Sequence, residues 1–509
     1  MIQIVIAALG GLIAALAFPP YGPGVLIVPG VALLLWSLRT SPRRTFGVWS
    51  GVGFGVPFFT ILMWWSTELG LIALIPLVLL MSGWFALLGW FVVGYSQAPA
   101  GRWLLIAIGS WSLIELLRYH VPFSGLEWGG AGYALSGYHW IRMGAPLVGT
   151  SGWTVLVVAV AGALMLAVTE RRLQWWGFAT LLTPVVVIAL SAVTTTRPSS
   201  NNEAEDGGRA TRAAIVQGST PCPFEKCPPD ERLRTFEQHL ELTRTIEPGA
   251  VDLVVWAEGS TGAANADPVL NSEIGDLIGA EARRIGAWFL VGSDRPISET
   301  EWVNANVVFN DRGGYMGEYR KQQGVPFGEY IPFRPLFEWI PELSQVPRDM
   351  VPGEGPVVFA FPDFTLGSVI SFEGSFARFA RQHVEIGAQV MVVATNEGSY
   401  GYTAVSDQLI GMTRMRAAEL GVPVIHAAVT GKSVFIDAGG EFSSAKSELG
   451  TEEIIYGEVL GGAPTFYSRT GDVTMVIAVM AGLIGVGRER RMLVSGPKKS
   501  EGEPDVGSP

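Results

Sequence analysis

Long apolar stretches in the first 194 residues restrict the fold of this chain more than any other feature of its sequence. The first of them, residues 2–18, contains no charged residue and ends at the turn FPPYGPG. The others lie near residues 24–38, 46–65, 70–95, 103–118, 151–168 and 174–194. Each is close to the length that crosses about 30 Å of hydrocarbon. We therefore predict a membrane α-helical bundle of about eight spans, with seven transmembrane helices in residues 1–194 and an eighth at Val473–Val486.

Basic residues mark the loops that should face the cytoplasm. They lie between the second and third stretches, before the fifth, between the sixth and seventh, and after the eighth: Arg39, Arg43, Arg44, Arg102, Arg171, Arg172 and RERR at 488–491. Lys and Arg favour the cytoplasmic side in short loops. Alternating crossings of the inner (plasma) membrane then leave the N-terminus and the tail 488–509 in the cytoplasm. The loop 119–150, and everything between the seventh and eighth spans, lies outside.

Composition agrees with a chain of which about half lies in lipid, since 49% of the residues are hydrophobic and 16% charged. The net charge of −11 arises largely after residue 195 and argues against a nucleic-acid partner, which needs a basic surface. Five scattered His and two Cys argue against a structural zinc site, and we expect no metal or other cofactor. Cys222 and Cys227 lie on the predicted outer side, where a disulfide and a pair of thiols are both compatible with their spacing.

A polar segment rich in Gly, Ser and Asn, residues 195–212, predicts a linker. Beyond it, residues 213–460 contain short β-branched runs such as DLVVWAE and LGSVISFE. Charged helical segments separate several of these runs, near residues 230–246, 271–285, 374–386 and 406–420. The alternation predicts a separate extracytoplasmic α/β domain with buried strands. Residues 461–487 form the return segment and the eighth helix.

Three segments of this domain carry candidate catalytic residues. Glu258 follows the apolar run LVVWA, and Ser371 with Glu373 follows another such run. Lys321 and Glu329 lie in the third segment, YRKQQGVPFGEY. A side chain that directly follows a buried strand lies at the sheet edge where α/β proteins place ligands. Taken alone, Glu258 is explained equally well as a solvated side chain at a strand end, and a lysine such as Lys321 is usually only a solvated surface charge. Together the three segments direct a serine hydroxyl, carboxylates and a lysine ammonium to one place.

The stretch FRPLFEWIPEL, residues 333–343, alternates aromatic and aliphatic side chains with few charges. Trp and Phe favour the headgroup boundary of a membrane, so the stretch fits an interfacial arm that admits lipid. An ordinary loop packed on the domain explains the same pattern equally well.

A series of motifs along the whole chain resembles the bacterial apolipoprotein N-acyltransferases, whose second half belongs to the nitrilase, or carbon–nitrogen hydrolase, superfamily. The series is FPPYG, GLEWGGAGYALSG, WAEGS, YRKQQGVPFGE, SFE, ATNEGSYG, MTRMRAAELGVPVI and TFYSRTGD. The resemblance implies an α-β-β-α sandwich. It also implies lipoprotein maturation by a ping-pong acyl-enzyme mechanism, in which a phospholipid acyl chain passes to the N-terminal diacylglyceryl-cysteine of a diacylated apolipoprotein.

The same resemblance assigns roles to individual residues. Glu258 matches the general base of the family, and Lys321 matches the lysine that stabilises the oxyanion. Ser371 occupies the position of the nucleophilic cysteine. Glu329 and Glu373 match two further functional glutamates.

The chain departs from the family pattern at three places. Serine replaces cysteine at position 371, Phe372 stands where tyrosine is common, and PCPFEKCPPD replaces a segment with a functional tryptophan. A serine hydroxyl is far less acidic than a thiol, whose pKa is about 8.5, and depends more on its base. Two alternatives to the acyltransferase therefore remain. One is a catalytically impaired relative that binds lipid or lipoprotein or acts as a membrane scaffold; resemblance to actinobacterial members implies a polyprenol-phosphate mannose synthase as its partner. The other is a membrane-tethered amidase.

Overall fold

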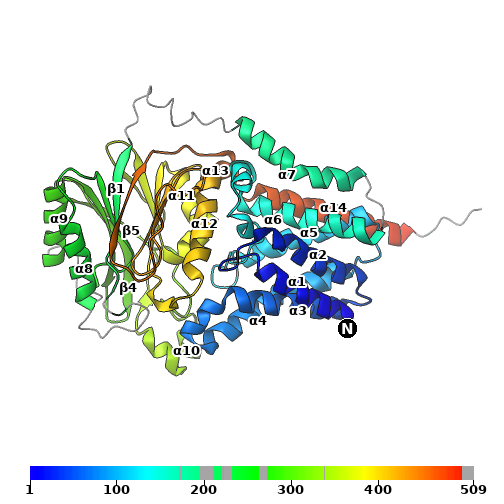
Figure 1. Ribbon diagram of the computed structural model, residues 1–509. Coiled ribbons are helices and arrows are strands. Elements are labelled where there is room, and N and C mark those ends of the chain that lie inside the picture. The colour runs from blue at the N-terminus through cyan, green and yellow to red at the C-terminus, as the bar shows by residue number, and fades with distance from the viewer. Residues whose placement is uncertain are drawn as a thin grey trace, which may run out of the picture.

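The computed structural model describes residues 1–170, 175–194, 210–220, 222, 232–262, 272–337 and 339–495. Figure 1 shows two bodies side by side, a bundle of long helices on the right and an α/β body with two sheets on the left. The predictions for Arg171, Arg172, Cys227 and most of the linker concern residues outside the described ranges.

The bundle is built from helices at both ends of the chain. They are α1 (Ile2–Ala15), α2 (Ile27–Thr40), α3 (Arg44–Leu62), α4 (Leu71–Val93), α5 (Ala100–Arg118), α6 (His139–Glu170), α7 (Trp175–Thr194) and α14 (Val473–Ser495). Within the described ranges, the four helices α3 to α6 are long and apolar enough to cross a membrane. Three shorter apolar helices accompany them, at Ile2–Ala15, Gly24–Thr40 and Gly177–Val193.

Two helices of the bundle extend beyond the apolar stretches from which they were predicted. The expectation of a loop over 119–150 is wrong from His139 onward, where α6 begins. Arg142 and Pro146 interrupt the apolar pattern there, and a kink at Gly149, with φ of 67°, separates this part from the apolar part. Helix α14 continues through the RERR motif to Ser495, because Arg and Glu are good helix formers.

Glycines allow the helices of the bundle to approach closely. A Cβ on Gly11 of α1 would lie 2.0 Å from the carbonyl oxygen of Phe54 on α3. A Cβ on Gly51 of α3 would lie 2.0 Å from the carbonyl oxygen of Phe85 on α4. Helices in lipid associate through such small residues, because the lipid supplies no hydrophobic drive between them. These glycines therefore make α1, α3 and α4 one tightly packed unit.

The α/β body contains two sheets (Figure 1). The first has the strand order β12-β1-β2-β3-β4-β5, with β6 paired to β4, and the second has the order β11-β10-β9-β8-β7. The strands of the first sheet are β1 (Thr211–Gln217), β2 (Leu253–Trp256), β3 (Trp288–Pro296), β4 (Glu301–Phe309), β5 (Tyr315–Arg320), β6 (Asp349–Met350) and β12 (Glu453–Val459). Those of the second are β7 (Val358–Ala360), β8 (Thr365–Ile370), β9 (Val390–Thr395), β10 (Val424–Ala428) and β11 (Val434–Ile436).

Helices cover the outer face of each sheet. They are α8 (Arg232–Arg244) and α9 (Glu273–Ile285) on the first sheet, and α11 (Ala377–Glu385) and α12 (Val405–Leu420) on the second. Buried residues such as Ile215, Leu290 and Val392 fill the core between the sheets. The layer order is therefore α-β-β-α. All four helices lie where the charged segments of the sequence predict them.

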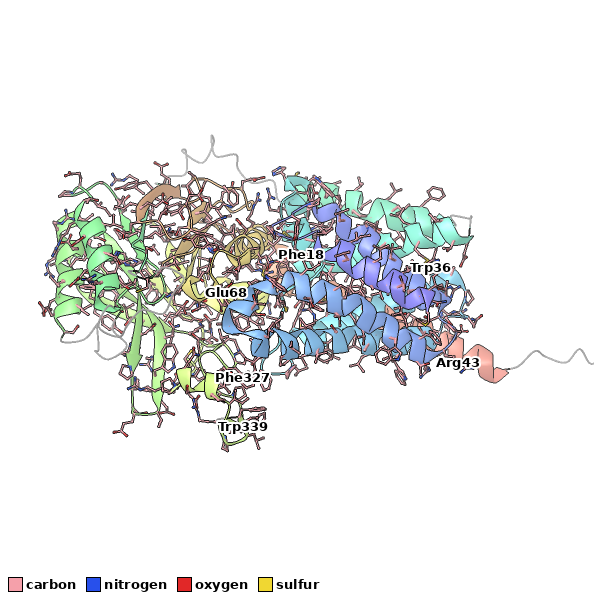
Figure 2. The ribbon with its side chains drawn as sticks, turned by 60° about the horizontal axis from the view of Figure 1, so that its bottom comes forward. Phe18, Trp36, Arg43, Glu68, Phe327 and Trp339 are labelled. Atoms are coloured by element: carbon pink, nitrogen blue, oxygen red, sulfur yellow. The ribbon has the colours of Figure 1, made fainter. Side chains whose placement is uncertain are left out.

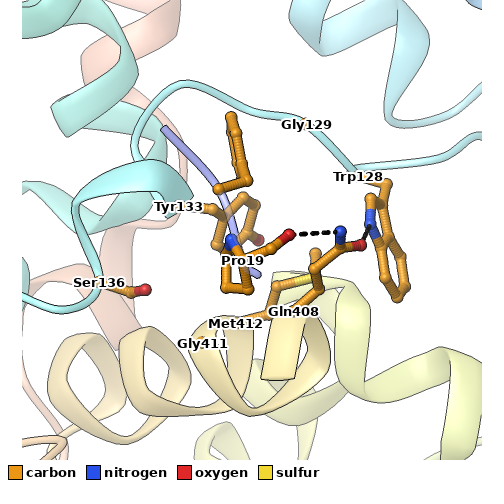
Figure 3. A pocket seen from close by; sticks show the side chains of 9 residues that line it. Pro19, Trp128, Gly129, Tyr133, Ser136, Gln408, Gly411 and Met412 are labelled. Carbon is orange, nitrogen blue, oxygen red and sulfur yellow. Dashed lines mark hydrogen bonds between the residues drawn. The ribbon is translucent and has the colours of Figure 1, made fainter. Parts of the chain in front are cut away.

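Helix α12 lies between the second sheet and the helix bundle, and its apolar residues share a core with the bundle. The polar side chain of Gln408 contributes to this junction (Figure 3). The side-chain amide of Gln408 donates to the carbonyl oxygens of Pro19 at 3.0 Å and Leu62 at 3.1 Å. Its oxygen accepts a hydrogen bond from the indole N–H of Trp128 at 2.8 Å. All three partners belong to the bundle or its connecting loops, so Gln408 is one of the contacts that join the α/β body to the bundle.

Candidate active site

Three strand ends carry the predicted site residues. Glu258 comes two residues after β2, Lys321 directly after β5, and Ser371 directly after β8. The first two strands belong to one sheet and β8 to the other, so the site depends on how the two sheets pack.

Lys321 lies at the centre of a buried ion cluster. Its side chain is 1% exposed, and its Nζ donates to Glu258 Oε1 at 3.2 Å and to Glu329 Oε1 at 2.7 Å. Burial alone would lower the pKa of Lys321, but the charges of Glu258 and Glu329 outweigh it and hold the pKa above its ordinary value. The side chain is therefore a fixed cation in a region of low dielectric, where its charge acts strongly. This burial excludes the interpretation of Lys321 as a solvated surface lysine.

Glu258 links the two sheets at the site. Its Oε1 accepts a hydrogen bond from the side-chain amide of Asn304 at 2.7 Å, and its Oε2 accepts one from the backbone N–H of Asn396 at 2.9 Å. Asn396 directly follows β9 of the second sheet. The residue before it, Thr395, donates its hydroxyl to Ser371 Oγ at 3.4 Å. These contacts bring the carboxylate and the serine hydroxyl to one edge of the sandwich.

Ser371 opens a short 3-10 turn, η7 (Ser371–Ser375). Its φ is 50°, in the left-handed region that residues other than glycine rarely adopt. Strained backbone of this kind persists at active sites where the surroundings hold it. The serine is partly exposed, and the ring of Phe372 behind it packs edge-on against Phe376 at 4.8 Å between centroids. A tight turn at a strand end presents a nucleophile in the same way in hydrolases.

Glu373 holds this turn in place. Its buried carboxylate accepts hydrogen bonds from the backbone N–H groups of Ile370 at 2.8 Å, Gln322 at 2.6 Å and Gln323 at 3.0 Å. The Tyr319 hydroxyl donates to the same carboxylate at 2.9 Å. Glu373 thus ties the serine turn to the segment that follows the buried lysine, which is a positioning role.

Burial raises the pKa of Glu373 to about 7 from its ordinary value of 4.5, against the opposing effect of its backbone donors and of Lys321. The folded protein then keeps this proton at pH values where the unfolded chain has lost it. The free energy of unfolding should therefore fall as the pH rises from about 4.5 to about 7, by up to ~3 kcal/mol. We expect Tm in detergent to fall as the pH rises across this window. The Glu373→Gln variant should lack this part of the dependence of Tm on pH. An identical slope in both proteins would contradict the prediction.

Sequence reasoning missed three contributors to the site, Asn304, Tyr319 and Asn396. The side-chain amide of Asn304 donates to both Glu258, at 2.7 Å, and Glu329, at 3.3 Å. An amide at an inward-facing position of the apolar run NANVVFN was the available signal. Asn396 contributes a backbone N–H, which no side-chain pattern reveals.

The assembled groups suit covalent acyl transfer. A hydroxyl at a strained strand end can attack a carbonyl, a neighbouring carboxylate can take its proton, and a fixed cation can stabilise the resulting oxyanion. Among the described residues, no group of three or more His, Cys, Asp or Glu side chains is placed to hold a metal ion.

Comparison with known proteins covers both bodies. The family model "Apolipoprotein N-acyltransferase N-terminal domain" matches residues 10–163, and the model "Carbon-nitrogen hydrolase" matches residues 212–460. Curated relatives named apolipoprotein N-acyltransferase include that of Geobacter metallireducens, 27% identical over 92% of this chain and 91% of the relative. That of Methylococcus capsulatus is 29% identical over 96% and 97%. Among solved structures, a carbon–nitrogen hydrolase from Helicobacter pylori G27 covers 49% of this chain and 89% of its own, with 18% identity and a TM-score of 0.39.

The sandwich, with its buried lysine, carboxylates and strand-end serine, matches the carbon–nitrogen hydrolase model and is attached to a bundle of apolar helices. Both parts match the curated relatives in the same order and over nearly their full length. The chain belongs to the apolipoprotein N-acyltransferase family.

Proposed function

We propose that this protein transfers an acyl chain from a phospholipid to the α-amino group of the diacylglyceryl-cysteine at the N-terminus of apolipoproteins. The observation that carries the proposal is the buried Lys321 ammonium, held between Glu258 and Glu329 and linked through one sheet edge to the strained Ser371. This arrangement supplies the nucleophile, the base and the oxyanion partner of an acyl-enzyme mechanism. The attached helices supply the membrane setting in which both lipid substrates reside.

In the first half-reaction, Glu258 takes the hydroxyl proton of Ser371 while the serine oxygen attacks the ester carbonyl of the phospholipid. Lys321 stabilises the charge that develops on the carbonyl oxygen. The bond to the glycerol oxygen breaks, and the lysophospholipid leaves with the proton from Glu258. In the second half-reaction, the α-amino group of the lipoprotein attacks the serine ester and gives a proton to Glu258. The serine oxygen leaves and recovers that proton, so the product is an amide and the enzyme is regenerated.

The proposal includes an orientation in the membrane. We assign residues 1–194 to a domain of seven spans, 213–460 to an extracytoplasmic domain, and 461–487 to the return segment and the eighth span. Figure 2 supports this orientation, because Arg43 lies at the end of the bundle remote from the α/β body. Arg39 lies near the same end and bonds carbonyl oxygens of the segment after α4. Basic residues favour the cytoplasmic side, so the α/β body lies on the other side.

An exposed apolar arm near the site fits a lipid surface (Figure 2). Phe333, Leu336 and Trp339 are 68%, 66% and 76% exposed, respectively. The arm is anchored through Phe123, in the loop after α5, whose ring packs against Phe327 at 5.9 Å and against Phe333 at 6.5 Å. Exposed aromatic clusters of this kind mark membrane or partner contacts, and we assign this one to capture of the phospholipid donor.

Removing the aromatic side chains of the arm should weaken use of vesicle-borne phospholipid. We expect the double variant Phe333→Ser, Trp339→Ser to raise KM for the donor about 10-fold with kcat little changed, because the two aromatic side chains together contribute about 1–2 kcal/mol at such a surface. Initial rates over a range of vesicle concentrations measure both parameters. Ile297→Ser, at an exposed apolar residue between β3 and β4, is the matched control. A loss confined to kcat would contradict the assignment.

Incubation of the purified protein with phospholipid and a diacylated lipopeptide tests the proposed function. The expected products are triacylated lipopeptide and lysophospholipid in equal amounts. Absence of product from this protein, with product from its Ser371→Cys variant, would favour the catalytically impaired relative. Hydrolysis of simple amides without acyl transfer would favour the membrane-tethered amidase. A stable partner, such as a polyprenol-phosphate mannose synthase, recovered whatever residue stands at 371 would favour the scaffold.

A further inference from the structure

The loop between α5 and α6 reaches the α/β body close to the nucleophile turn. Glu127 of this loop is 4% exposed, and both of its carboxylate oxygens accept a hydrogen bond from the backbone N–H of Ala377, each at 3.2 Å. Ala377 is the first residue of α11, which begins directly beyond the turn that Ser371 opens. The first N–H groups of a helix have no partner within it, and negative charge is favourable at this end. A side chain from a loop of the bundle therefore caps the N-terminus of a helix in the α/β body.

Glu127 is itself held by buried polar groups that span the junction. The Tyr133 hydroxyl donates to its Oε2 at 2.8 Å, and Arg416 of α12 donates to the Tyr133 hydroxyl. Arg416 is paired with Glu419. The Glu419 carboxylate accepts hydrogen bonds from the backbone N–H of Thr150 at 2.8 Å and from its hydroxyl at 2.7 Å. These bonds alternate between the bundle and α12. The position of Glu127 therefore depends on how the α/β body is docked on the bundle.

The second residue of α11 is held by the same loop. Arg378 donates to the carbonyl oxygens of Tyr119 and Ser124, both at 2.7 Å. Its guanidinium lies 4.4 Å from the centre of the Phe376 ring. That ring packs in turn on Phe372, the residue directly after the nucleophile. A continuous set of contacts thus runs from the loop of the bundle to the turn that presents the hydroxyl.

We propose that Glu127 is a positioning residue for acyl transfer: by holding the N-terminus of α11, it keeps the turn at Ser371 aligned with Glu258 and Lys321. Glu127 acts through the helix and contacts none of the reacting groups. The inference rests on the proposed function and deepens it, because the α/β body then reaches full activity only when docked on the bundle. A displacement of about 1 Å at a reacting centre can cost about 100-fold in rate, so a modest shift of α11 has a large effect.

Three variants of the full-length protein in phospholipid micelles test this role. Glu127→Ala should slow single-turnover acylation of Ser371 by about 10- to 100-fold, with the KM for phospholipid little changed. Glu127→Gln keeps one acceptor oxygen and should recover the rate to within about fivefold of the unmodified protein. Trp128→Phe is the matched control, because its indole N–H bonds Gln408 at the same junction. It should lower Tm to a similar extent and change the acylation rate by less than about twofold.

Alkylation at position 371 gives a second readout that requires no acyl transfer. In a Ser371→Cys background, peptide mass spectrometry follows the rate at which iodoacetamide modifies residue 371. Glu127→Ala should slow this modification at least about fivefold and Trp128→Phe should not, because thiolate reactivity depends on alignment with the buried cation. If the unmodified protein forms no acyl adduct, the proposed function fails and the alkylation rates alone decide the role of Glu127. Unchanged acylation and alkylation rates in Glu127→Ala would overturn the inference. So would equal slowing in Glu127→Ala and Trp128→Phe when the two variants lose the same Tm. If Glu127→Ala does not fold, the alkylation rate of Glu127→Gln relative to Trp128→Phe decides in the same way.

Discussion

Replacing Glu258 by glutamine should reduce acyl transfer by about 10²- to 10⁴-fold, the range that loss of a positioned general base produces. The amide keeps the shape of the carboxylate and an oxygen for the backbone N–H of Asn396, but it accepts no proton from Ser371. Because the base acts when the nucleophile forms, the acylation half-reaction should slow as much as overall turnover. Single-turnover release of lysophospholipid measures this step directly.

Glu318→Gln is the matched control for this substitution. Glu318 lies three residues before Lys321 on β5 and pairs with Arg295 at 2.7 Å and Arg320 at 2.6 Å, outside the site. Its loss should lower Tm with little effect on rate, since it removes ion pairs at the edge of the first sheet. Equal rate losses in Glu258→Gln and Glu318→Gln would show that the effect reflects damage to the sheet, and the assigned role of Glu258 would then be wrong.

Substitutions of Ser371 should move activity in opposite directions. Ser371→Ala removes the nucleophile and should reduce acyl transfer to background. Ser371→Cys should accelerate acylation at least about 10-fold, because a thiol with a pKa of about 8.5 beside a fixed cation forms a thiolate far more readily than a hydroxyl ionises. Rates of lysophospholipid release from the three proteins at one pH compare these effects.

The matched control for Ser371 is Ser375→Ala in the same turn. The Ser375 hydroxyl donates to the local carbonyl oxygen of Phe372 at 2.7 Å, so its loss tests whether the turn tolerates removal of a hydroxyl. We expect nearly unchanged rates in this variant. Activity of Ser371→Ala equal to that of the unmodified protein would rule out a serine acyl-enzyme.

The parts of the fold that depend on local pattern could be predicted from the sequence. Apolar runs of membrane length identify the helices of the bundle, and β-branched runs separated by amphipathic segments identify the sandwich. The start of α6 at His139 was missed, because a helix buried at a junction needs no uniform apolar run. There the arrangement of neighbouring elements, rather than local hydropathy, decides which residues are helical.

Some features of the candidate site could likewise be predicted from the sequence, and others could not. The strand-end positions of Glu258 and Ser371 were visible, since each follows an apolar run. The burial of Lys321 was not, because a lysine in a charged segment is usually solvated. Here it is stabilised by Glu329 of its own segment together with Glu258, which is 63 residues away. The contact between Glu127 and Ala377 joins residues 250 positions apart and carries no local signal.

Mass spectrometry of the protein after incubation with phospholipid alone tests the central claim most directly. We expect a mass increase of one acyl chain, located on Ser371, with an equal amount of lysophospholipid released. An oxygen ester on serine should resist neutral hydroxylamine, whereas the thioester in the Ser371→Cys variant should be cleaved. Acyl transfer to lipopeptide without any adduct on residue 371, or with the adduct on another residue such as Cys222, would contradict the account.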